Sequence, residues 1–279
     1  MTGGAATCSV VRGSAARAEG PVRETVLLLH GSAGTGALWH HTKSVLQPLY
    51  RCLTPDLIGY GTSMSWQKHS AFTVDAERLA LEPLLACCGE TFHLVGYSYG
   101  GVVALRLALE NASRVRTLTL IEPVLFNVLR DAGAWPAFLH FTRIRRQFVD
   151  ALARDGAEAA LQPFIDFWAG DGAWNELSGS RRADMLRCAG KIVLDWEAAF
   201  AFAPTAQSLA SLGQRTLLIH GDESPPPMVE LVNALHDFMP GSARVVLPGA
   251  NHLLPIAQAP VVTECIRSHL RVSSERNMR

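Results

Sequence analysis

The chain has 279 residues, 48% of them hydrophobic and 18% charged, and its 25 basic and 25 acidic side chains balance. This composition excludes a disordered chain, and the length predicts one large α/β domain with room for an insertion. The balanced charge gives no reason to expect a nucleic-acid or membrane-surface partner. No apolar run reaches the ~18 residues that span a bilayer.

The amino-terminal stretch, residues 1–21, has no apolar core after a basic start, so it does not resemble a secretory leader. The six cysteines are scattered along the chain, and none of them forms a CxxC pair. Both observations predict a cytoplasmic protein with free thiols.

Short apolar runs alternate with helical stretches along most of the chain. Strands are predicted at residues 25–31, 92–96, 115–121 and 215–221, and weaker ones at 51–56 and 243–249. Helices are predicted at residues 75–88, 101–112 and 228–238. Runs that are apolar on both faces are typical of a parallel sheet covered by helices, so we expect a doubly wound α/β fold.

The alternation stops after the strand at residues 115–121. Residues 127–212 show no clear strand and are rich in alanine, arginine and aromatic residues. We therefore predict a helical cap at residues 127–212, inserted into a core made of residues 1–126 and 213–279.

The sequence GYSYG at residues 96–100 is the strongest functional signal. It matches G-x-S-x-G directly after a predicted strand and before a predicted helix, a context in which the serine hydroxyl is exposed on a sharp turn. Ser98 is therefore the predicted nucleophile.

A loop of small residues, HGSAG at residues 30–34, follows the first predicted strand. Such a loop can direct backbone N–H groups at a developing oxyanion. We expect the N–H groups of Ser32 and Tyr99 to form this oxyanion hole. His30 has two interpretations, of which a buried side chain that holds the loop is favoured over a catalytic role.

The predicted base is His252, in the sequence GANH after the last predicted strand. Imidazole exchanges protons near neutral pH, and a loop at this place returns to the carboxyl edge of the sheet, where Ser98 points.

The motifs HGSAG, DLIGYGTS (residues 56–63), GYSYGG and GANH together resemble the α/β-hydrolase superfamily, in its serine hydrolase branch with a helical cap. The resemblance covers roughly residues 25–270. It implies a serine nucleophile, a covalent acyl-enzyme, and the chain order nucleophile, acid, histidine. It also implies that no metal or organic cofactor takes part, and that the cap selects the substrate.

The acid is the part of the pattern in which this chain departs from most relatives. They carry the acid three residues beyond the glycine at 221, and this chain has Ser224 there. Glu122, which ends the strand at residues 115–121, is the predicted acid, because a carboxylate there needs a partner such as a histidine. Asp222 is the alternative, and Glu223 or no acid at all also remain open.

The sequence therefore predicts a serine hydrolase that cleaves a carboxylic ester, or a related acyl bond, of a small molecule. We expect Trp39, Tyr97 and Phe126 to line the substrate pocket. The basic pair Arg181–Arg182 fits either a solvated helix face or contact with an anionic substrate. A non-hydrolytic small-molecule receptor and a lyase on the same scaffold are the alternative functions, and the sequence does not indicate an oligomeric state.

Overall fold

The computed structural model describes residues 23–66 and 71–275, so the prediction about a leader in residues 1–21 lies outside it. Its centre is a six-stranded sheet with the order β2-β1-β3-β4-β5-β6, in which every neighbouring pair is parallel. The strands are β1 (Thr25–Leu29), β2 (Arg51–Leu53), β3 (Phe92–Tyr97), β4 (Val115–Ile121), β5 (Arg215–Gly221) and β6 (Ser242–Leu247). The predicted doubly wound α/β fold is confirmed.

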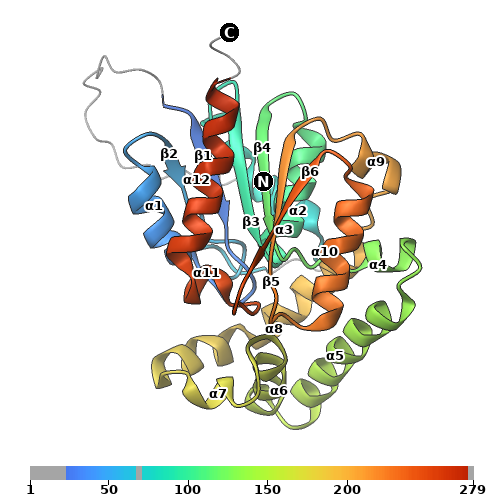
Figure 1. Ribbon diagram of the computed structural model, residues 1–279. Coiled ribbons are helices and arrows are strands. Elements are labelled where there is room, and N and C mark those ends of the chain that lie inside the picture. Colours follow the sequence, from blue (N-terminus) through green and yellow to red (C-terminus); the bar gives the residue numbers. More distant parts are fainter. Residues whose placement is uncertain (1–22, 67–70, 276–279) are drawn as a thin grey trace, which may run out of the picture.

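Each face of the sheet is covered by helices, which explains why the strand sequences are apolar at successive positions. In β1, Val26 and Leu28 belong to one core cluster, and Leu27 and Leu29 belong to the other. Helices α1 (His40–Leu46) and α12 (Ala259–Glu275) contribute to the first cluster, and α12 crosses the near face of the sheet in Figure 1. Helices α2 (Val74–Ala86), α3 (Tyr99–Glu110) and α10 (Pro226–Phe238) contribute to the second.

The segment between β4 and β5 is helical, as predicted, and residues 127–212 contain no strand. Its helices are α4 (Asn127–Asp131), α5 (Trp135–Arg154), α6 (Ala157–Ala169), α7 (Ala173–Glu176), α8 (Gly179–Ala201) and α9 (Ala206–Ala210). Helices α5 to α8 gather at one end of the sheet (Figure 1). Because α4 and α9 pack against α10 of the core, the domain boundaries at residues 127 and 212 stay a prediction.

The strand order reverses between β1 and β3, since the chain builds β2 outside β1 and then continues on the other side. In open α/β sheets, ligands bind at the carboxyl ends of the strands at such a reversal. The loop after β1 and the turn after β3 therefore meet where a site is expected. Among the described helices, none is both long and apolar enough to cross a membrane.

Candidate active site

Ser98 occupies a strained turn between β3 and α3. Its backbone has φ 54° and ψ −119°, a conformation that is costly for a residue with a side chain. The turn is tight, because a Cβ on Gly96 would lie 2.4 Å from the carbonyl oxygen of Gly100. The glycines of the motif thus allow strand and helix to approach closely while the serine is held out of the helix line.

His252 lies in the loop after β6, with Nε2 3.1 Å from Ser98 Oγ. The Tyr97 hydroxyl donates a hydrogen bond to the carbonyl oxygen of His252 at 2.9 Å. The Trp168 ring, from α6, lies over the imidazole with 4.1 Å between the ring centroids. These contacts fix both the backbone and the ring plane of His252.

Glu122 follows β4 directly, and its side chain is fully buried. Its Oε2 lies 2.6 Å from His252 Nδ1, a geometry in which Nδ1–H donates to the carboxylate. Its Oε1 accepts from the Gly221 N–H at 2.9 Å and from the Ser224 hydroxyl. Both oxygens therefore have donors, as a buried carboxylate requires. The left-handed backbone of Glu122, with φ 42°, is a second strained position beside Ser98.

The alternative acids do not contact His252. Asp222 is exposed, and its Oδ1 accepts from the Gly249 N–H at 2.7 Å. Glu223 is also exposed. Ser224, at the position where most relatives carry the acid, is buried and donates to Glu122 instead. The hydroxyl thus supports a carboxylate that comes from the neighbouring strand.

The two predicted oxyanion donors, Ser32 and Tyr99, line one cavity together with Ser98 and His252. The Tyr99 N–H is at the first position of α3, where it lacks an intrahelical partner. Within the described backbone, neither the Ser32 nor the Tyr99 N–H has a hydrogen-bond acceptor. Both groups are therefore available to a substrate oxygen.

His30 holds the loop that carries Ser32. Its Nε2 accepts from the Leu57 N–H at 2.9 Å, and its Nδ1–H donates to the Gly31 carbonyl at 2.8 Å. Burial lowers the pKa of this imidazole, so the neutral form that makes both bonds is favoured. The contacts agree with the structural interpretation of His30.

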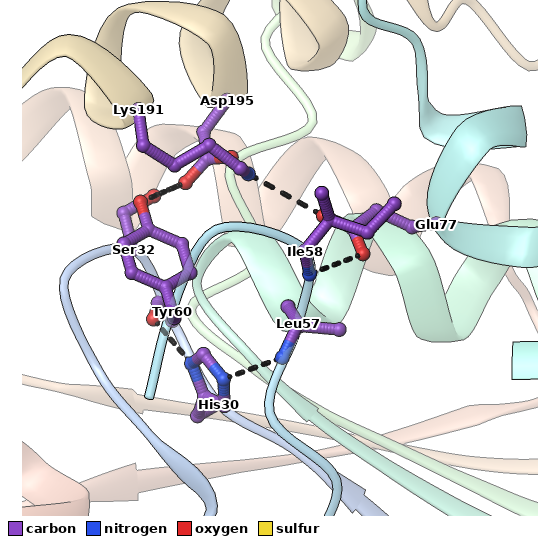
Figure 2. Close-up of polar contacts among 9 residues, drawn as sticks. His30, Ser32, Leu57, Ile58, Tyr60, Glu77, Lys191 and Asp195 are labelled. Carbon is purple, nitrogen blue, oxygen red and sulfur yellow. Dashed lines mark hydrogen bonds and ion pairs between the residues drawn. The ribbon is translucent and has the colours of Figure 1, made fainter. Parts of the chain in front are cut away.

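A buried ionic network joins α8 of the cap to the core beside the Ser32 loop (Figure 2). Asp195 accepts from the hydroxyls of Ser32 at 2.7 Å and Tyr60 at 2.5 Å, and it forms an ion pair with Lys191. Lys191 Nζ also lies 3.3 Å from Glu77 Oε1. Burial raises the pKa of Glu77 to about 7, against the opposing charge of Lys191. The sequence gives no sign of this network, because a lysine and an aspartate four residues apart are common on exposed helix faces.

The cavity above Ser98 has a volume of about 460 Å³. Of the three predicted pocket residues, only Tyr97 lines it. Trp39 is buried in the core beside α1, and Phe126 is buried among Phe141, Trp196 and Phe200. Both predictions were wrong, because these rings fill the core instead of facing the cavity.

The apolar wall of the cavity comes from helices α6 and α8, which follow β4 in the chain. The cap side chains that line the cavity are Phe164, Ile165, Trp168, Arg181, Met185, Asp195 and Trp196. Among the described residues, no group of three or more histidine, cysteine or carboxylate side chains is arranged to hold a metal ion.

A serine, a histidine and a buried carboxylate at the carboxyl edge of a parallel sheet are the arrangement of the α/β-hydrolase class. Residues 26–264 match the model of the alpha/beta hydrolase family, and the chain belongs to that family.

The chain is 33% identical over 156 residues to lipase LipV of Mycobacterium tuberculosis, a match that covers 54% of this chain and 52% of LipV. The match thus spans about half the length of this relative. A solved thermophilic esterase from Thermogutta terrifontis is 25% identical, with a TM-score of 0.66 and coverage of 90% of both chains. MenH from S. aureus is 17% identical with a TM-score of 0.71, covers 90% of this chain and 94% of MenH, and shares the fold.

Proposed function

We propose that the protein is a serine hydrolase that cleaves a carboxylic ester or a related acyl bond through an acyl-enzyme. The observation that carries the proposal is the hydrogen-bond chain from Ser98 Oγ to His252 Nε2 at 3.1 Å, and from His252 Nδ1 to Glu122 Oε2 at 2.6 Å. Membership of the family and the similarity to a lipase and an esterase support it. The cytoplasmic location stays a prediction from the sequence.

In the proposed reaction, Ser98 Oγ attacks the carbonyl carbon while His252 Nε2 takes its proton. The oxyanion accepts hydrogen bonds from the N–H groups of Ser32 and Tyr99. The imidazolium then donates the proton to the leaving alcohol, and an acyl-Ser98 ester remains. Water, deprotonated by His252, attacks this ester, and the imidazolium returns the proton to Ser98 Oγ as the acid is released. The carboxylate of Glu122 holds the ring in place and stabilises the imidazolium.

A fluorophosphonate probe and a chromogenic short-chain ester test this function. The wild type should be labelled and should release p-nitrophenol in a burst followed by steady turnover, while Ser98→Ala should do neither. Equal labelling of both proteins would contradict the role of Ser98. A single burst without turnover would favour the receptor alternative, and turnover without a trappable acyl adduct in mass spectrometry would favour the lyase.

A further inference from the structure

The two arginines of the basic pair, Arg181 and Arg182, have different surroundings in the structure. Arg182 donates to the carbonyl oxygens of Leu177 and Asn175, both at 3.1 Å, and its guanidinium lies 6.0 Å from the Trp174 ring centroid. It therefore holds the segment before α8. Arg181 lines the cavity that contains Ser98, and the proposed reaction does not use it.

Arg181 lies on the inward face of α8. Residues spaced by about four or seven positions share one face of a helix, and from Arg181 this spacing leads to Met185, Ile192 and Trp196. These three side chains are buried. The outward side carries Asp184 and Arg187, which are exposed and pair with each other. Arg181 therefore does not belong to a solvated helix face. It lies on the buried face of α8, where the other residues at this spacing are apolar.

The side chain of Arg181 is half-buried, and its guanidinium makes no hydrogen bond or ion pair with the groups that the structure describes. Asp195 is the carboxylate that shares the cavity lining, but it lies about four turns further along α8. Its oxygens are occupied by Lys191, Ser32 and Tyr60 (Figure 2). The positive charge in the cavity wall is thus left without compensation.

The charge of Arg181 affects Tyr97, which lies beside Ser98 and His252 in the cavity wall. Burial and then the charge of Glu122 raise the pKa of the Tyr97 hydroxyl, and the charge of Arg181 opposes them. Tyr97 directly precedes Ser98 and contacts His252. Ser98 and Arg181 line the same cavity, so a substrate held at Ser98 can extend along the cavity toward Arg181.

We infer that Arg181 binds a carboxylate on the substrate, so that the preferred substrates are monoesters of dicarboxylic acids. This inference rests on the proposed function, since Ser98 attacks the ester end while Arg181 holds the acid end. The cavity wall formed by Phe164, Trp168 and Met185 accommodates the apolar chain between the two ends. A guanidinium pairs with a carboxylate through two parallel hydrogen bonds. One uncompensated cation matches one carboxylate charge better than a phosphate dianion.

The test compares two ester series of equal chain length. One consists of p-nitrophenyl monoesters of dicarboxylic acids from succinate to suberate, and the other of the same molecules with the free acid methylated. The wild type should show a kcat/KM about 10- to 100-fold higher for the free acids at the best chain length, the usual value of a charged hydrogen bond. The preference should shrink at high salt.

Arg181→Gln should lose this preference, because its kcat/KM for the free acids should fall to the value for the methylated series. Arg181→Lys, which keeps the charge but not the forked geometry, should retain part of the preference. Arg187→Gln is the matched control, because this arginine lies outward on the same helix, and it should behave as the wild type does. Equal kcat/KM for the two series in the wild type, or an equal loss for both in Arg181→Gln, would overturn the inference.

Absence of hydrolysis in both series, with no fluorophosphonate labelling, would count against the proposed function instead. Calorimetric titration with adipate would then decide the role of Arg181. Binding to the wild type that Arg181→Gln abolishes would support the anion site, and absence of binding would overturn it.

Discussion

Glu122 directly follows β4, and its carboxylate accepts hydrogen bonds from groups at the end of β5. The Gly221 N–H at the end of β5 and the Ser224 hydroxyl just beyond it both donate to Oε1, which turns Oε2 toward His252. Two groups of one strand end thus fix the carboxylate of a residue that belongs to the neighbouring strand. The physical requirement is a fixed charge beside Nδ1, and Glu122 places its carboxylate there from the end of β4.

Glu122→Gln should therefore lower kcat by up to about 10⁴, the cost of neutralising the acid of a serine triad. Asp222→Asn should stay within about tenfold of the wild type, because Asp222 only binds the Gly249 N–H. Steady-state ester hydrolysis measures both, with circular dichroism to show that the variants are folded. A crippled Asp222→Asn beside a nearly normal Glu122→Gln would refute the assignment of the acid.

The contact between Ser224 and Glu122 leads to a rescue experiment. An aspartate at position 224 would bring a carboxylate next to the place that the Glu122 carboxylate occupies. The double variant Glu122→Gln/Ser224→Asp should recover at least about tenfold in kcat over Glu122→Gln. Ser224→Ala in the same background is the control and should recover nothing. Equal rates for the two double variants would show that position 224 cannot place an acid beside His252.

Helix α8 contacts α2 and the Ser32 loop through charged side chains as well as through apolar packing. Lys191 lies between Asp195 of the same helix and Glu77 of α2, and all three side chains are buried. Asp195 in turn accepts from Ser32, so the loop that carries a predicted oxyanion donor is tied to the cap. Removing the lysine would leave two carboxylates buried without their cation.

Lys191→Met should lower the free energy of unfolding by about 3–5 kcal/mol, the typical cost of breaking a buried ion pair on one side. Arg187→Gln should change it by less than about 1 kcal/mol, because its ion pair with Asp184 is exposed. Urea denaturation measures both values. A loss below about 1 kcal/mol for Lys191→Met would mean that the network is dispensable for stability.

At the scale of the whole molecule, burial of histidines makes stability depend on pH. His269, in α12, is buried and lies 3.2 Å from the Arg215 carbonyl oxygen through Nε2. Burial, and then the charge of Arg215, lower its pKa to about 4 from an ordinary value of 6.5. The unfolded chain therefore binds a proton at a pH where the folded chain does not. The free energy of unfolding therefore does not depend on His269 protonation above pH 6.5, and it decreases as the pH falls from 6.5 toward 4.

His269→Gln should remove this part of the acid sensitivity. The free energy of unfolding of the wild type, minus that of the variant, should fall by about 3 kcal/mol between neutral pH and pH near 4. The difference should be constant above neutral pH, which serves as the internal control. Urea titrations at several pH values measure it, and a difference that does not change with pH would contradict the lowered pKa.

The sequence by itself determined the features that depend on local chemistry. Apolar runs of the right length predicted the strands, because a sheet covered on both faces needs apolar residues at successive positions. The glycine-rich turn predicted a serine held out of the helix line, because only glycines allow the close approach of β3 and α3. The serine at position 224 and the carboxylate at the end of β4 led to the prediction that Glu122 is the acid, and Glu122 lies beside His252 in the structure.

Only the tertiary structure decided which side chains face the cavity and which fill the core. Trp39 and Phe126 lie near the site along the chain, yet their rings point into the core. Trp168 and Arg181 are far from Ser98 in sequence, yet the packing of α6 and α8 brings them to the cavity. The direction of a side chain depends on how its element is rotated against its neighbours, and in this protein that rotation follows from contacts between distant segments, which local sequence patterns do not encode.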